Sequence, residues 1–210
     1  MEGIITKIEL CKKNKNRVNI YIDEEFAFAC SIDLVYYHSI EKGKKVNLKL
    51  LNDVIEEDNY IKGKNHALKI LEKSYKSEKE ISDKLIIKGY DLKTVERIID
   101  FLKEYDFIND EKLAERYIEE KRSSNGKNKI KFMLMKKGIR EEIINQKLNC
   151  MEENLEEDGA LKLARKKYES LIKSEDNNVI IKKKLSQYLL RRGYNWEDVK
   201  KILKGIVKDE

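Results

Sequence analysis

Two kinds of hydrophobic spacing divide the chain. In residues 3–30, apolar residues alternate with polar or small ones, as at 18–22 and 26–30. Alternation with a period of two, in β-branched and aromatic residues, is typical of strands that bury one face. We therefore expect a small antiparallel β-meander here. The predicted turns lie at 14–16 and 23–24, and a possible extra edge strand lies at 46–48.

From about residue 50 onward the apolar residues are spaced by three and four. The segment 95–102 has apolar residues at i, i+3, i+4 and i+7, and 199–206 repeats that pattern. This spacing is typical of a helix that buries one stripe. Candidate helix N-caps accompany it. They are Ser31 for a short helix through Tyr37, Ser77 with Glu80 as a capping box, Asp110, and Asn195 before Trp196.

Three glycines, Gly89, Gly138 and Gly193, recur in one setting: a helix, a basic residue, the glycine, an apolar residue, a cap and another helix. A glycine after the last helical residue can adopt φ > 0 and end the helix. A further helix is predicted before each pair, at about 63–74, 110–123 and 157–172. The chain is therefore predicted to be mainly α, with tandem three-helix repeats. The expected domains are 1–60 (meander, short helix and linker), 61–105, 106–153 and 154–210.

Composition narrows the class of protein. The 210 residues contain 40% charged side chains and no proline, and carry a formal net charge of +6. No apolar run approaches the length of a membrane span, and the start does not have the pattern of a secretory signal. Cys11, Cys30 and Cys150 show no metal-binding spacing, so we expect a cytoplasmic protein with reduced thiols. Whether Cys11 and Cys30 face each other on adjacent strands stays open.

The positive charge is concentrated in the repeats. Residues 1–60 hold 9 basic and 11 acidic side chains, so the excess of cations lies in 61–210. The segments 121–140 and 177–196 contain no acid, and they occupy equivalent places in the second and third repeats. Such a stripe suits a polyanion or an acidic protein, but it is also compatible with a solvated Lys-rich face. The predicted basic face consists of Lys121, Arg122, Lys129, Lys131, Lys136, Lys137, Arg140, Lys182, Lys183, Lys184, Arg191 and Arg192.

Signals for catalysis or cofactor binding are poor. His38 and His66 are isolated, and no nucleophile, phosphate-loop or dinucleotide motif is present. The acidic runs 23–25 and 56–58 are expected to be a turn and a helix face rather than metal ligands. We therefore expect no enzyme activity, no cofactor and no metal. The aromatic residues at the glycine turns, Tyr90 and Tyr194, either pack against helices or stack on bases, and Trp196, at an expected first helical position, has the same two interpretations.

One segment resembles a known family. Residues 106–122 are similar to the pattern I-x-D-x-x-x-A-x-x-Y-V-x-x-R of the RecX regulatory proteins, with Ile118 in place of the usual Val. Residues 137–139 match the K-G-I of that family's second repeat, and 88–90 and 192–194 match the flanking repeats. The resemblance covers nearly the whole chain. Positions that it marks as fold-keeping are Asp110, Ala114, Tyr117, Gly126, Gly138 and Ile139.

The resemblance implies an elongated, curved array of three-helix modules that inhibits the RecA recombinase. Such proteins lodge in the groove of the RecA–DNA filament and limit filament growth and strand exchange, in recombination, DNA repair and the SOS response. The implied partner is the RecA filament, with single- or double-stranded DNA as a further partner, and we expect a monomer. The alternatives are a sequence-independent nucleic-acid-binding module with helix-turn-helix-like repeats and a scaffold for an unrelated acidic protein. The acidic residues in 140–142 count against insertion of that helix into a major groove.

Overall fold

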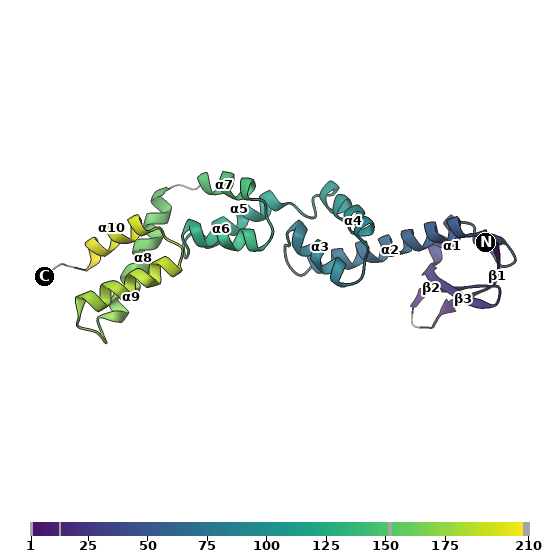
Figure 1. Ribbon diagram of the computed structural model, residues 1–210, viewed down its shortest axis with the longest axis horizontal. Helices are drawn as coiled ribbons and strands as arrows, with labels where there is room; N and C mark the ends of the chain where they lie inside the picture. Colours follow the sequence, from purple (N-terminus) through teal and green to yellow (C-terminus); the bar gives the residue numbers. More distant parts are fainter. Residues whose placement is uncertain (1, 13, 151–152, 208–210) are drawn as a thin grey trace. The chain divides into compact units, whose positions relative to one another are not determined.

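The chain forms two compact units in a computed structural model that describes residues 2–12, 14–150 and 153–207 (Figure 1). Unit 1 comprises Met1–Ser74 and Ile81–Phe107. Unit 2 comprises Tyr75–Glu80 and Ile108–Glu210. The predicted β-rich start and helical remainder are both confirmed.

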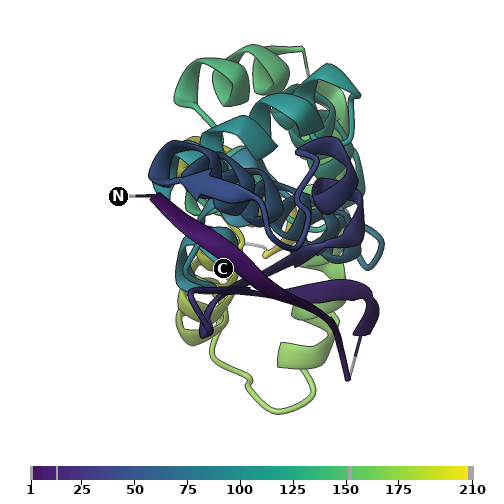
Figure 2. The same cartoon turned by 90° about the vertical axis from the view of Figure 1, so that its right-hand side faces the viewer.

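Unit 1 begins with a four-stranded antiparallel sheet, in which the long β1 strand crosses the front of Figure 2. The order is β3-β2-β1-β4, from strands β1 (Glu2–Cys11), β2 (Asn14–Ile22), β3 (Glu25–Ser31) and β4 (Lys45–Asn47). The predicted turn at 23–24 is confirmed, since both residues have positive φ. The turn predicted at 14–16 is wrong, because those residues already pair or extend within β2. Strand β2 separates Cys11 from Cys30, so the two cysteines are not on adjacent strands.

Helix α2 (Leu48–Leu71) belongs to both the sheet and the first repeat of unit 1. We predicted a linker before residue 61 and a helix only from about 63. This is wrong, because α2 is one continuous helix that begins at Leu48. The side chain of Asn47 caps its start by accepting a hydrogen bond from the Leu50 N–H (2.8 Å). Val54 then packs into the core of the sheet, beside the short helix α1 (Ile32–Tyr37), which Ser31 caps as predicted. The expected domain boundaries themselves stay a prediction.

A buried ion pair attaches α2 to the sheet. The carboxylate of Asp58, 3% exposed, accepts two hydrogen bonds from the Arg17 guanidinium (2.9 and 3.0 Å) and lies 2.6 Å from Lys62 Nζ. Burial raises the pKa of Asp58, but the hydrogen bonds from Arg17 and Lys62 outweigh it and hold the pKa below its ordinary value. The third residue of the acidic run 56–58 is thus a structural anchor and not part of a solvated helix face.

The three-helix repeats follow the predicted plan. The first consists of the second half of α2 with α3 (Glu78–Ile87) and α4 (Leu92–Glu104). The second consists of α5 (Asp110–Lys121), α6 (Lys127–Lys136) and α7 (Glu141–Asn149). The third consists of α8 (Glu153–Leu171), α9 (Asn178–Arg191) and α10 (Trp196–Ile206). Each repeat buries apolar residues at helical spacing, so the residues that the spacing predicted to be buried form its core.

The glycine turns between the second and third helix of each repeat are confirmed. Gly89, Gly138 and Gly193 have φ of +93°, +81° and +88°. Each glycine N–H donates to the carbonyl three residues back, and the next N–H donates to the carbonyl five residues back. These two hydrogen bonds form a Schellman motif, which satisfies carbonyls that a helix end leaves open.

Within the repeats, the predicted helix starts are confirmed in two cases and wrong in one. Ser77 and Glu80 form the predicted capping box, with reciprocal hydrogen bonds of 3.1 Å. Asn195 caps α10. Asp110 is not an N-cap, because the preceding Asn109 side chain already accepts from the first N–H groups of α5. Asp110 instead accepts a hydrogen bond from the Glu78 N–H (3.0 Å). Within the described ranges, no helix combines the length and apolar character needed to cross a membrane.

Candidate binding surface

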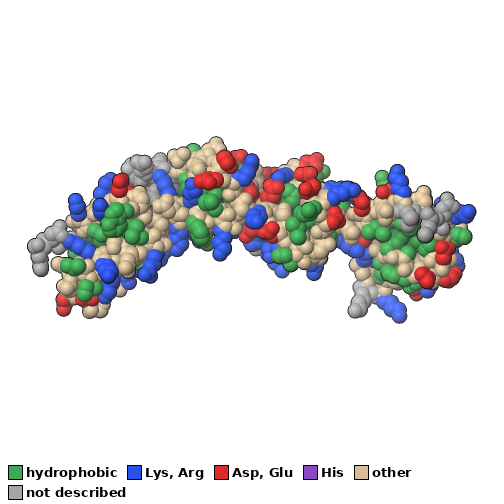
Figure 3. Space-filling view, viewed as in Figure 1, with side chains coloured by type: hydrophobic (Ala, Val, Ile, Leu, Met, Phe, Trp, Pro, Cys, Tyr) green, Lys and Arg blue, Asp and Glu red, His purple; other side chains and the backbone are tan. Residues whose placement is uncertain are grey.

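The predicted basic face lies in unit 2, mainly on α6 and α9. Figure 3 shows Lys and Arg side chains gathered along these two helices. Lys121 and Arg122 instead stand at the end of α5, and Arg140 is the N-cap residue of α7. Of the residues predicted for this face, α6 carries three: Lys129, Lys131 and Lys136. Helix α9 carries four: Lys182, Lys183, Lys184 and Arg191.

Helices α9 and α6 meet end to end through their backbones. The N–H of Gly126 donates to the carbonyl of Arg192 (2.9 Å), and the N–H of Asn128 donates to the carbonyl of Gly193 (3.2 Å). The open carbonyls at the end of α9 thereby satisfy open N–H groups at the start of α6, which has no side-chain cap. A Cβ on Gly126 would collide with the backbone of Gly193. Both glycines are therefore needed for this close contact.

The other end of α6 makes a similar contact with Tyr75–Glu80, the segment that belongs to unit 2. The Ser77 hydroxyl donates to the carbonyl of Lys137 (2.5 Å). The side chain of Lys79 lies directly against Gly138, where a Cβ would collide with it. In both junctions, a glycine turn packs against the beginning of a second helix. We call these the α9–α6 junction and the α6–Ser77 junction.

The junctions divide the basic residues before each glycine into two kinds. Lys137 Nζ lies 3.2 Å from the Glu80 carboxylate, and Arg192 Nη1 donates to the Ser124 carbonyl (3.1 Å). The residues immediately before them, Lys136 and Arg191, are exposed. Adjacent residues on a helix point about 100° apart, so one cation serves the junction while its neighbour faces solvent.

Carboxylates neutralise several other members of the predicted face. Lys131 Nζ is 2.6 Å from Glu141, and Lys184 Nζ is 2.9 Å from Glu175. The hydrogen bond from Lys131 lowers the pKa of Glu141, and that from Lys184 lowers the pKa of Glu175. Ion pairs also join Lys121 to Glu120 (2.6 Å) and Arg122 to Glu119 (2.5 Å), and Lys182 has an interaction partner as well.

Five of the predicted cations make no side-chain hydrogen bond or ion pair with any described residue. They are Lys129, Lys136, Arg140, Lys183 and Arg191. The α9–α6 junction brings two of them toward each other, because the backbone of Gly193 packs against Lys129 and Arg191 ends α9 two residues earlier. The structure thus retains a smaller set of cations that are available to an anionic partner.

An exposed aromatic residue on α6 was missed from the sequence. The Phe132 side chain is 63% exposed, although it lies in the middle of the helix. The available signal was its phase: Ile130 and Leu134 form the buried stripe, and Phe132 falls between them on the opposite side. Of the three aromatic residues that we had considered, only Trp196, at the start of α10, is as much as 49% exposed. Tyr194 is buried at 2% exposure, and the Tyr90 ring packs near Gly63 of α2.

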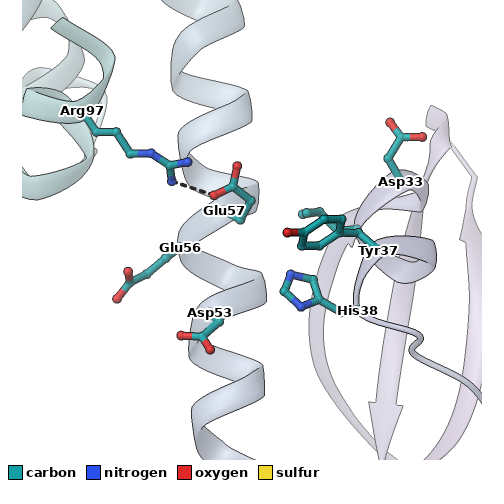
Figure 4. Close-up of a pocket in the computed structure, with 8 residues that line it drawn as sticks. Asp33, Tyr37, His38, Asp53, Glu56, Glu57 and Arg97 are labelled. Carbon is teal, nitrogen blue, oxygen red and sulfur yellow. Dashed lines mark hydrogen bonds and ion pairs between the residues drawn. The ribbon is translucent and has the colours of Figure 1, made fainter. Parts of the chain in front are cut away.

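Unit 1 contains a pocket of opposite character (Figure 4). It has a volume of about 630 Å³ and is lined by eight residues: Asp33, Leu34, Tyr37, His38, Asp53, Glu56, Glu57 and Arg97. The single guanidinium, from Arg97, lies 2.6 Å from a Glu57 oxygen and 3.7 Å from the centre of the Tyr60 ring. Because carboxylates outnumber cations, this pocket repels phosphate and does not extend the basic face.

Comparison with known proteins gives consistent matches along the chain. Residues 3–47 match the model described as regulatory protein RecX N-terminal domain. Residues 64–102, 109–148 and 156–203 match the models of the first, second and third RecX three-helix domains.

Whole-chain relatives give the same result. A "Regulatory protein RecX" of Clostridium tetani is 51% identical over 203 residues, covering 97% of this chain and 94% of the relative. One of Clostridium acetobutylicum is 47% identical over 210 residues, covering 99% and 98%. A crystal structure of regulatory protein RecX superimposes with a TM-score of 0.70 at 25% identity, over 99% of this chain and 100% of that one.

Proposed function

The chain belongs to the RecX family of regulatory proteins, and from this premise we propose that it inhibits the RecA recombinase. In this proposal the protein lodges in the groove of the RecA–DNA filament and limits filament growth and strand exchange. It acts by binding, without catalysis or a cofactor, in the cytoplasm and as a monomer.

One observation supports the groove-binding part of the proposal: five cations of the predicted basic face make no side-chain hydrogen bond or ion pair with any described residue, while their neighbours are neutralised. Unpaired cations need no ion pair to be broken before they contact an anion, so they contribute more to binding than paired ones. A filament groove offers phosphates and acidic side chains, and either could be the anion. Only the salt response separates them, because each phosphate contact releases counterions and steepens the dependence on salt.

The proposal is tested by titrating the protein into RecA-promoted strand exchange and single-stranded-DNA-dependent ATP hydrolysis. We expect inhibition below equimolar protein. We expect a Lys129/Lys136/Arg191→Glu variant to lose at least tenfold in potency at low salt. No slowing of either reaction at equimolar wild-type protein would overturn the proposal.

A control variant with the same change in net charge tests whether the position of the cations matters, and not only their number. A Lys162/Lys166/Lys204→Glu variant changes the net charge by the same amount on α8 and α10, where these residues are exposed. We expect this variant to inhibit like the wild type. Both variants should first show the circular dichroism and unfolding midpoint of the wild type, since a folding defect would imitate a loss of binding.

Direct insertion of a recognition helix into duplex DNA is less well supported. Helix α7 follows the second glycine turn and begins with Glu141 and Glu142, which are exposed. Two carboxylates at that end repel the phosphate backbone, although Lys131 neutralises the first of them. The basic face therefore favours a partner that lies along α6 and α9 over one that receives α7.

A further inference from the structure

Helix α6 presents an aromatic ring at the centre of its exposed face. Single exposed apolar residues are common on protein surfaces and need no explanation by themselves. The surroundings of Phe132 are unusual, because Lys129 precedes it by three residues and Lys136 follows it by four. With 100° and 1.5 Å per residue, both lysines lie within about 60° of the ring around the helix and about 4.5 and 6 Å from it along the axis.

The two lysines that share this face are the unpaired ones. Lys131 and Lys137, which point to the sides of α6, are held by Glu141 and Glu80. Neither Lys129 nor Lys136 has a side-chain partner among the described residues. The face therefore consists of a solvent-exposed ring between two lysines without a described partner, the exposed Lys136 and the half-buried Lys129, and Met135, 48% exposed, lies beside the ring.

We propose that Phe132 is a base-stacking residue that makes this surface bind single-stranded nucleic acid in preference to duplex. Lys129 and Lys136 contact the phosphates on either side of the stacked base. Stacking on an aromatic side chain tolerates any sequence, because every base has a π-face. In a duplex the bases are already stacked inside the helix, so the ring gains nothing there, whereas the lysines attract both forms. The ring, and not the charge, is what discriminates.

The area and charge of the face favour nucleic acid over a protein partner. A stable protein–protein contact buries about 800 Å² on each side, with an apolar centre. On α6 the large exposed apolar residues are only Phe132 and Met135 among those described. The end of α9 adds Leu190, 42% exposed, and Arg191, which again pairs a small apolar surface with a free cation. This inference needs no RecA and so goes beyond the proposed function.

Helix α9 offers a matched control. Gln187 lies six residues before Gly193, as Phe132 lies six residues before Gly138, and it is also exposed. Lys183 precedes it by four residues and Arg191 follows it by four, so the charge around the two positions is similar. A Gln187→Ala variant removes an exposed side chain in an equivalent setting without removing a ring.

The experiment compares three labelled probes of about 20 units at low salt: oligothymidine, a sugar–phosphate oligomer without bases, and a duplex. We expect Phe132→Ala to bind oligothymidine about 5- to 100-fold more weakly than wild type, and the other two probes unchanged. Phe132→Trp should retain the wild-type preference. Gln187→Ala should bind all three probes like the wild type. Lys129→Ala with Lys136→Ala should weaken binding to all three and lower the salt slope by more than one.

Two results would overturn the inference. Equal losses for Phe132→Ala on oligothymidine and on the base-free oligomer would show that the ring supports the lysines and does not stack. Wild-type protein that binds duplex as tightly as oligothymidine would show that the surface does not discriminate. RecA inhibition is measured separately, so either result leaves the proposed function to its own test. Unfolding midpoints of all variants confirm that the surface remains folded.

Discussion

The second helices of the three repeats, α3, α6 and α9, share their buried positions and differ in their exposed ones. Eight and four residues before the glycine, every repeat has an aliphatic residue that is no more than 1% exposed. These pairs are Ile81 with Leu85, Ile130 with Leu134, and Leu185 with Leu189. The glycine and its positive φ are also common to all three.

The exposed positions have diverged. Six residues before the glycine, the repeats have Asp83, Phe132 and Gln187, and two residues before it they have Ile87, Lys136 and Arg191. The comparison shows that the buried positions specify the three-helix unit, because their side chains form its core. The exposed positions are free to vary, so they are where the second and third repeats differ from the first in what they can bind.

The largest effect should come from the glycine turns, which share φ but not surroundings. A Cβ on Gly193 would meet the backbone N of Lys129, whereas a Cβ on Gly89 would meet nothing within 4 Å. We expect Gly193→Ala to lower the free energy of unfolding by about 3 kcal/mol or more, and Gly89→Ala by about 1–2 kcal/mol from the positive φ alone. Gly138→Ala should lie between them, because a side chain is easier to move than backbone. Urea unfolding followed by circular dichroism measures all three, and equal losses would contradict the junction.

The next effect separates the adjacent cations. Lys136→Glu with Arg191→Glu should weaken filament or oligothymidine binding by about tenfold or more at low salt and leave the unfolding midpoint unchanged. Lys137→Glu with Arg192→Glu carries the same charge change but disrupts both junctions. We expect that variant to lower the free energy of unfolding by about 2 kcal/mol. If both pairs affected only binding, the division between junction and surface would be wrong.

A smaller effect should come from converting the third repeat to resemble the second. Gln187→Phe places a ring between Lys183 and Arg191, as Phe132 lies between Lys129 and Lys136. If stacking is additive, oligothymidine binding should become about 5-fold tighter, with no change for the base-free oligomer. Anisotropy titrations with both probes measure this, and an equal gain on both would indicate a general change in the surface.

The smallest effect should be a pH dependence of one junction only. Burial raises the pKa of Glu80, but hydrogen bonds from Ser77 and Lys137 outweigh it and hold the pKa below its ordinary value of 4.5. This stabilisation is therefore complete above pH 4.5 and is lost as the pH falls through the lower folded value. We expect less than about 1 kcal/mol. Unfolding measured between pH 7 and 3 should show a smaller dependence in Glu80→Gln than in wild type, and identical profiles would exclude this role.

Much of the fold could be predicted from the sequence, because its determinants are local. The alternation at 18–30, the three glycine turns and the capping box at 77–80 each depend on residues within a few positions of one another. The start of α2 was not predicted. Its first half contains apolar residues, but it was assigned to a linker because its partner is the sheet and not another helix of the repeat. It is helical because Asn47 caps it and Val54 and Asp58 are held by the sheet.

The amino-acid sequence by itself determined the repeats, the family and the region of positive charge. Only the tertiary structure decided which cations remain available, and the reason is geometric. Lys136 and Lys137 are chemically alike and adjacent, but a helix points them about 100° apart. Lys137 is the one that is neutralised because Glu80, 57 residues away along the chain, lies on its side of the helix. For the same reason, the sequence alone does not distinguish Phe132 from a buried apolar residue of a helix. The structure does, because its side chain is 63% exposed.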